Sequence, residues 1–204
     1  MDEYEHLNAL QGLPIEKIQP TTYKANLDSA IAYLKVGQKG LALDALTKAL
    51  GQVPEQDINI DNAAYFKILA LLAELNISET NQIDAARYLD QGLHIKPDHA
   101  DLLFLKGVLL YEQGEFDITL VLITRFLVGI EAPDAKYYDY VYNNDGAVNE
   151  AMENIAINAY KNSVNKEKLL NIIEQLSEKS KLPLMKKLVL NLQRVSDPFN
   201  RIES

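Results

Sequence analysis

The side chains that most often catalyse reactions or bind metals are few in this sequence, and they stand apart from one another. The three histidines, His6, His94 and His99, have no partner at the spacing of a zinc site such as His-Glu-x-x-His. The chain has no cysteine, which excludes disulfides, thiolate metal sites and cysteine nucleophiles together. We therefore expect no metal site and no cofactor, and we expect His94 and His99, on either side of Pro97, to be surface or groove residues.

Two further patterns resemble catalytic or nucleotide-binding motifs only in part. Gly37-Gln38-Lys39-Gly40 looks like a phosphate loop, but no strand pattern precedes it and no Gly-Lys-Ser/Thr follows, so we interpret it as a turn between helices. Glu112 and Glu115 form a carboxylate pair, but acid–base catalysis needs a pocket that raises one pKa, and the sequence predicts none there. The Gly-x-Ser-x-Gly motif of serine hydrolases is also absent. We therefore predict a non-enzymatic protein without catalytic residues.

The charge of the chain limits the kinds of partner that it can bind. A net charge of −9 argues against nucleic acid, whose binding needs Lys and Arg to neutralise phosphates. One dense basic cluster occurs near the C-terminus, and we interpret it as a solvated helix end. It consists of Lys179, Lys181, Lys186 and Lys187. The acidic N-terminus lacks the apolar core of a secretory signal, and no apolar run is long enough to span a membrane, so we expect a cytoplasmic protein without membrane insertion.

Helix-forming residues dominate the chain and alternating strand patterns are absent, so we predict an all-α fold. Between Ala100 and Leu127, two apolar stripes at helical spacing meet at Gly114, which ends the first helix and suits a positive φ. Helices joined by so short a turn lie antiparallel. The same pattern recurs upstream, because Ala85 stands 34 residues before Thr119 and Ala42 stands 43 residues before Ala85.

This helix–turn–helix period, with small residues at the packing points and a proline at the boundary, resembles the tetratricopeptide repeat (TPR) family. The residues that carry the resemblance in the three copies are Ala30, Tyr33, Gly37, Ala42, Leu46, Ala49 and Pro54, then Leu69, Leu72, Ala73, Ala85, Leu89 and Pro97, then Leu103, Gly107, Gly114, Phe116 and Ile123. The match covers about half of the chain and departs from the family pattern at Asn26, at Thr119 and in nine extra residues after Pro54. The resemblance implies a right-handed α-solenoid of antiparallel helix hairpins. Separately, we expect that Gly107 is a glycine because a bare Cα lets a second helix come close.

We expect four segments along the chain. They are an N-terminal arm over 1–22, three TPR-like hairpins over 23–130, a Tyr-rich connecting segment over 131–146, and a degenerate fourth hairpin with a C-terminal capping helix over 147–204. Thr21 or Thr22 is expected to cap the first helix. The inner stripe of the last helix is predicted to be Leu184, Leu188, Leu192 and Val195.

The Tyr-rich segment ends in Asn143-Asn144-Asp145-Gly146, which is a clear turn signal. Its polar side chains and Glu150 suggest a cation site, but they lack the spaced acidic ligands of a calcium loop. The start of a capped helix is the better interpretation.

The resemblance also implies a binding surface, because stacked hairpins line a concave groove with the first helix of each pair. The inward-facing residues that the family implies are Lys24, Leu27, Ile31, Leu34, Lys35, Lys67, Ala70, Glu74, Asp101, Phe104, Val108 and Tyr111. This largely apolar set suits a peptide or helical segment of a partner protein, so we predict a non-catalytic protein–protein interaction adaptor or scaffold. The family's clamp for acidic chaperone tails is missing, since the matching residues are Lys24 with Asp28 and Asp101 with Leu105.

Two alternatives remain open. The groove residues could be covered by the N-terminal arm, by the Tyr-rich segment or by a second copy of the chain in a homodimer. The chain could also be an accessory region of, or beside, a larger enzyme or assembly system, such as a glycosyltransferase or an envelope or pilus assembly system, with residues 137–142 as a docking strip.

Overall fold

The protein is all helical, as the sequence predicts. The computed structural model describes residues 22–131 and 146–197, and within these ranges every regular element is a helix. The chain divides into two compact units, Met1–Val53 and Pro54–Ser204. None of the described helices combines the length and the apolar character needed to cross a membrane. The predictions about the N-terminal arm and about most of the Tyr-rich segment fall outside the described residues.

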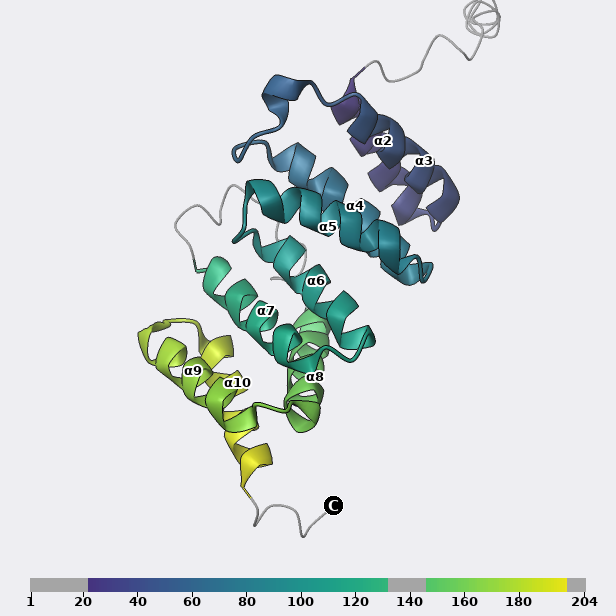
Figure 1. Ribbon diagram of the computed structural model, residues 1–204. Helices are drawn as coiled ribbons and strands as arrows, with labels where there is room; N and C mark the ends of the chain where they lie inside the picture. The colour runs from purple at the N-terminus through teal and green to yellow at the C-terminus, as the bar shows by residue number, and fades with distance from the viewer. Residues whose placement is uncertain (1–21, 132–145, 198–204) are drawn as a thin grey trace, which may run out of the picture. The chain divides into compact units, whose positions relative to one another are not determined.

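The first unit contains one helical hairpin. Its helices are α2 (Tyr23–Lys35) and α3 (Lys39–Gly51) (Figure 1). The Thr22 hydroxyl caps α2 by accepting a hydrogen bond from the Ala25 amide at 3.3 Å, which confirms the predicted cap. Gly37 takes a φ of +74° in the turn, a conformation that glycine adopts without strain. Fully buried small side chains let the two backbones lie close together, and these are Ala30, Ala42 and Ala49.

The second unit begins with two more hairpins. Its first elements are the 3-10 helix η2 (Glu55–Asp57), α4 (Ala63–Ser78), α5 (Gln82–Ile95), α6 (Ala100–Glu112) and α7 (Phe116–Gly129). Helix α4 pairs with α5, and α6 pairs with α7. Asn81 caps α5 by accepting a hydrogen bond from the Asp84 amide at 3.4 Å. Gly114 has a φ of +80° in the α6–α7 turn, which is the conformation predicted from its position.

The three anchors of the repeat register occupy comparable places. Ala42, Ala85 and Thr119 are all fully buried, and each lies in the second helix of its hairpin. The hydroxyl of Thr119 donates to the Glu115 carbonyl at 3.0 Å and lies 3.4 Å from the Gly107 carbonyl. A threonine therefore fits where the repeat pattern has alanine, because its polar atom is hydrogen-bonded.

Successive hairpins of the second unit pack in chain order. Helix α5 contacts α6, and α7 contacts α8 (Gly146–Asn162). The first helices also contact one another, since α4 packs against α6 and α6 packs against α8. The second unit is thus a series of consecutive hairpins whose first helices form a row.

The last three helices pack differently from the hairpins before them. They are α8, α9 (Lys166–Lys179) and α10 (Pro183–Ser196). Helix α8 contacts mainly α7 and α10, and α9 contacts mainly α10 and α7, so α10 lies against both members of the expected fourth hairpin. The buried face of α10 consists of Met185, Leu188, Val189 and Leu192. The prediction of the inner stripe is therefore confirmed for Leu188 and Leu192, whereas Leu184 and Val195 are only half-buried.

Two carboxylates connect the ends of α9 to the ends of α7. Asp117, in the first turn of α7, accepts hydrogen bonds from the Ser163 hydroxyl and from the Val164 amide at 3.1 Å. Glu131, just beyond α7, accepts from the Ser180 hydroxyl at 2.7 Å and from the following amide at 2.8 Å. The N-terminus of α9 therefore lies beside the N-terminus of α7, and the C-terminus of α9 lies beside the C-terminus of α7. The two helices run in the same direction.

Candidate partner-binding surfaces

Seven of the predicted groove residues lie on α4 and α6, two helices that pack against each other. They are Lys67, Ala70 and Glu74 on α4, and Asp101, Phe104, Val108 and Tyr111 on α6. Spacings of three and four residues place each group on one face of its helix. The structure therefore brings these seven residues onto neighbouring helices of one unit.

Burial divides these residues into two groups. Asp101 and Phe104 are each 5% exposed, and the Phe104 ring packs against the Phe126 ring with centroids 5.3 Å apart. Val108 and Tyr111 are half-buried and present part of their apolar surface to solvent. Phe104 is therefore a core residue by its packing, and of the predicted residues on α6 Val108 and Tyr111 are the ones that a partner can reach.

The other five predicted groove residues lie on α2, in the first unit. They are Lys24, Leu27, Ile31, Leu34 and Lys35. The two lysines are exposed, Ile31 and Leu34 are half-buried, and Leu27 is buried. The Lys24 ammonium lies 5.7 Å from the centroid of the Tyr23 ring, within the range of a cation–π contact.

The two histidines beside Pro97 differ in their surroundings. His94 is exposed, but His99 is only 2% exposed. The His99 ring stacks on Phe66 of α4, with centroids 4.7 Å apart and an angle of 32° between the planes. The expectation that His99 lies on the surface or in a groove is therefore wrong. His99 occupies the N-cap position of α6, and the packing of α4 against α6 buries it.

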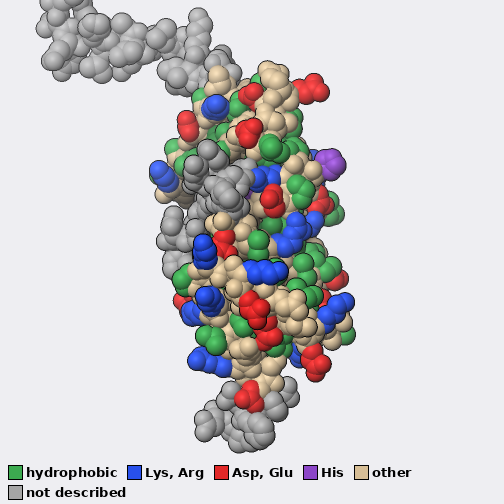
Figure 2. All heavy atoms as spheres, turned by 90° about the vertical axis from the view of Figure 1, so that its left-hand side faces the viewer, with side chains coloured by type: hydrophobic (Ala, Val, Ile, Leu, Met, Phe, Trp, Pro, Cys, Tyr) green, Lys and Arg blue, Asp and Glu red, His purple; other side chains and the backbone are tan. Residues whose placement is uncertain are grey.

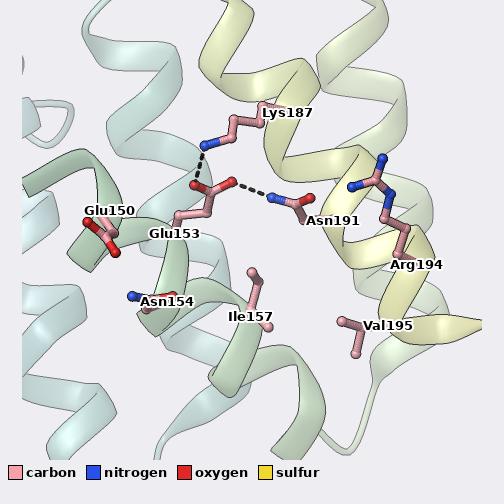
Figure 3. Close-up of a pocket in the computed structure, with 8 residues that line it drawn as sticks. All are labelled: Glu150, Glu153, Asn154, Ile157, Lys187, Asn191, Arg194 and Val195. Carbon is pink, nitrogen blue, oxygen red and sulfur yellow. Dashed lines mark hydrogen bonds and ion pairs between the residues drawn. The ribbon is translucent and has the colours of Figure 1, made fainter. Parts of the chain in front are cut away.

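A concave surface lies between α8 and α10 (Figure 3). It is a cleft of about 650 Å³ lined by Glu150, Glu153, Asn154 and Ile157 of α8 and by Lys187, Asn191, Arg194 and Val195 of α10. Lys187 and Asn191 converge on the buried carboxylate of Glu153, where the Lys187 ammonium lies 2.7 Å from one oxygen and the Asn191 amide donates to the other. Glu153 therefore joins α8 to α10 with both of its oxygens bonded.

Two features of the sequence point toward this cleft, although neither identifies it. Glu153 stands next to Met152 on a helix face that is otherwise apolar, and Lys187 and Asn191 are four residues apart on α10. Such spacing puts both α10 residues on one face of their helix. It does not determine which helix that face meets, so the contact with Glu153 could not be read from the pattern.

The shifted pKa values belong to structural hydrogen bonds. Burial raises the pKa of Tyr65, and a hydrogen bond of 2.8 Å from the Gln91 amide lowers it in part. The pKa of Asp117 is lowered, first by the Ser163 hydroxyl and then by the Asn165 side chain. Both shifts keep these groups in their ordinary charge states at neutral pH, so neither group is prepared for proton transfer. In the part of the chain that the structure describes, no three His, Cys, Asp or Glu side chains gather closely enough to hold a metal ion.

The arrangement of the helices defines the class of this protein, which is an all-α protein of consecutive helical hairpins. No protein-family model matches the chain, and no curated protein matches it. We therefore infer the function of this protein from the residues on its surfaces.

Proposed function

We propose that this protein is a non-catalytic adaptor that binds a peptide or helical segment of a partner protein along the row of first helices. The observation that supports this proposal most directly is the contact of α4 with α6 and of α6 with α8 in the second unit. In the proposal the hairpins form a right-handed α-solenoid of the tetratricopeptide type, and the row is its concave side. The proposal includes a cytoplasmic location, because a chain without cysteine needs no oxidising compartment to fold.

Val108 and Tyr111 are the expected apolar anchors on α6. The Tyr111 ring lies edge-on to the Phe116 ring with centroids 5.8 Å apart, so its position is partly fixed before a partner arrives. Aromatic side chains held in this way lose little conformational entropy on binding and are common at the centres of interfaces. Lys67 and Glu74 on the neighbouring α4 are expected to orient charged residues of the partner.

The mixture of charges on the surface also fits a protein partner. On the face shown in Figure 2, basic and acidic side chains intermingle, and hydrophobic side chains lie among them. A polyanion such as nucleic acid needs a continuous basic surface, whereas a protein interface combines apolar contact with charges of both signs.

The test is selection of a binding peptide from a displayed library on the full chain, followed by titration of that peptide against variants. Val108→Glu places a charge on the proposed surface and should weaken binding by about tenfold or more, which is about 1.4 kcal/mol. Ile83→Glu makes the same chemical change at a residue of α5 that is 83% exposed, and it should leave the affinity unchanged. Equal affinities of the two variants, with melting temperatures unaltered, would show that the peptide binds elsewhere.

A second candidate function is self-association, and exposed aliphatic side chains on α7 and α9 favour it. Ile118, Val121 and Val128 on α7 and Ile172 on α9 are between 43% and 49% exposed. Helices α7 and α9 pack against each other, and apolar side chains exposed on neighbouring helices are candidates for an interface between proteins. Sedimentation across a concentration series tests this function, with Val121→Glu expected to reduce any dimer, and a strict monomer at high concentration eliminates it.

A further inference from the structure

Helices α7 and α9 lie side by side, and hydrogen bonds at their ends identify the flank that each helix turns toward the other (Figure 1). At one end, Asp117 of α7 accepts a hydrogen bond from the side-chain amide of Asn165, the N-cap residue of α9. At the other end, Glu131, just beyond α7, accepts from the Ser180 hydroxyl at 2.7 Å. The side chains that share a flank with these residues therefore lie along the contact between the two helices.

The flank of α7 that faces α9 is aliphatic between its two carboxylates. Val121 and Val128 follow Asp117 by four and eleven residues, spacings that keep to one side of an α-helix. Val121 is 43% exposed and Val128 is 44% exposed, although most of the other side chains of α7 are buried. The contact with α9 therefore leaves both valines partly open to solvent.

The flank of α9 that faces α7 is aliphatic in the same way. Ile172 follows Asn165 by seven residues, or two helical turns, and Leu176 follows Ile172 by four. Ile172 is 43% exposed and Leu176 is half-buried. Glu174 accepts a hydrogen bond from Gln193 of α10 at 2.7 Å, so the opposite flank of α9 is the one that faces α10. The aliphatic surface formed by the two facing flanks, called the α7–α9 strip below, consists of Val121, Val128, Ile172 and Leu176.

Three cations border the α7–α9 strip. Lys168 stands four residues before Ile172 and Lys179 stands seven residues after it, so both share the flank of α9 that faces α7. Arg125 stands on α7 between the two valines. All three side chains are exposed, and among the described residues no carboxylate lies within ion-pair distance of either lysine.

The two carboxylates at the ends of the strip are already hydrogen-bonded. Asp117 and Glu131 accept from hydroxyls and amides at the two ends of α9. These donors offset part of each negative charge. The strip thus offers aliphatic surface with positive borders, on a chain whose net charge is −9.

We propose that the α7–α9 strip binds an amphipathic helix of a partner protein whose aliphatic stripe is flanked by carboxylates. The two valines of the strip are seven residues apart, which is about 10 Å along the axis of α7 and two turns of a partner helix. Leucines at positions i, i+4 and i+7 of the partner match this spacing, and carboxylates beside them face Lys168 and Lys179.

The charges of the strip favour an acidic partner over a second copy of the chain, because in a symmetric dimer the same cations would meet one another. The strip also suits a helix better than an anionic membrane. Apolar side chains that bind a bilayer enter it by about 5–10 Å, whereas the short valine and isoleucine side chains here are less than half exposed among longer lysine and arginine side chains. The strip is separate from the α4–α6 surface, so either surface can fail its test without affecting the other.

The test uses the full chain and fluorescence anisotropy with a labelled synthetic peptide that carries leucines at helical spacing and glutamates beside them. A peptide with glutamine in place of glutamate should bind at least about tenfold more weakly. A peptide of the same composition in scrambled order, which has no aliphatic stripe, should lose at least as much. Equal binding of the first peptide and either matched peptide would overturn the proposal.

The protein variant Lys168→Glu with Lys179→Glu should also reduce affinity for the glutamate peptide by about tenfold. The control is Lys48→Glu with Lys186→Glu, which changes the net charge equally at two exposed positions outside the strip. If the control weakens binding as much as the strip variant, the attraction comes from the overall charge and the site is refuted.

The aliphatic part of the strip is tested by Val121→Gln with Ile172→Gln, which should weaken peptide binding by about tenfold with the melting temperature unaltered. The control is Ile83→Gln with Leu190→Gln, at residues outside the strip that are 83% and 54% exposed. Two outcomes would identify a different occupant and overturn the proposal. One is that the strip variant abolishes a dimer in sedimentation but leaves peptide binding unchanged. The other is that the chain binds vesicles of phosphatidylserine and phosphatidylcholine through the strip and does not bind the glutamate peptide.

Discussion

Gly92 is the position where one added methyl group tests the packing of the second unit most directly. A Cβ at Gly92, in α5, would lie 2.3 Å from Leu102 Cδ1 of α6 and 3.2 Å from Leu69 Cδ1 of α4. Both leucines are fully buried in a closely packed core, so neither side chain has open space into which it can move. Gly92→Ala therefore forces a shift where α4, α5 and α6 meet.

Gly107 of α6 supplies a matched control for this substitution. A Cβ there would lie 3.5 Å from Ile123 Cγ1 and 3.7 Å from Leu122 Cβ, which is ordinary van der Waals contact. Replacing glycine by alanine gains about 1 kcal/mol of helix propensity at either position. Overpacking costs about 1–3 kcal/mol, and only Gly92 incurs it. We therefore expect Gly92→Ala to be about 1–3 kcal/mol less stable than Gly107→Ala, with Gly107→Ala no less stable than the wild type.

Urea denaturation followed by far-ultraviolet circular dichroism measures this difference, because both glycines lie in the same unit. Leu102→Val sharpens the test, since it removes the δ carbon that the new methyl group would meet. In a double-mutant cycle, Gly92→Ala should cost less in the Leu102→Val background than in the wild type. Equal unfolding free energies for the two alanine variants, or a cycle without coupling, would refute the proposed contact.

Three other substitutions test separate features by urea denaturation. Phe104→Ala removes a buried ring that packs against Phe126 and should cost about 3–5 kcal/mol, and a cost near zero would return Phe104 to the binding surface. The pKa of Asp117 is lowered in the folded state, chiefly by the Ser163 hydroxyl. The ionised carboxylate therefore stabilises the fold at a pH above about 3.9, the pKa of an aspartate in the unfolded chain. This stabilisation is lost as the pH falls through the pKa of Asp117 in the folded state. Asp117→Asn should therefore lose less stability than the wild type between neutral pH and about pH 3, and identical losses would contradict this assignment. Asn81→Ala removes the side-chain oxygen that caps α5 and should cost about 0.5–2 kcal/mol, and an unchanged unfolding free energy would contradict this cap.

Local backbone features could be predicted well from the sequence because they depend on a few neighbouring residues. The cap at Thr22 and the positive φ of Gly114 follow from residue type and position at a helix end. The burial of Ala42, Ala85 and Thr119 followed from the repeat register, since residues at equivalent positions in successive hairpins meet equivalent neighbours.

Contacts between helices distant in the chain could not be predicted in the same way. Gly107 was expected to permit a close approach, but an alanine methyl group fits there, whereas a Cβ would be crowded at Gly92 and at Gly129. The periodicity of one helix indicates which face is buried and gives no measure of how far the opposing side chains reach. His99 and Glu153 show the same limit, because each is a polar residue buried by a helix that its own spacing does not identify.

The hydrogen bonds of Asp117 and Glu131 affect whether the last helices of this chain can be deleted. In an array held together by apolar packing alone, the last helices can be deleted at the cost of exposing one hydrophobic face. Here, removal of α9 and α10 would also take away the Ser180 hydroxyl and the Lys181 amide that Glu131 accepts from. The Ser163 and Val164 groups that bind Asp117 would remain, but in a chain end that α9 no longer follows. The terminal helices are thus joined to α7 by hydrogen bonds as well as by apolar packing. A shortened version of this protein would need substitutions in or next to α7 that replace the lost hydrogen bonds.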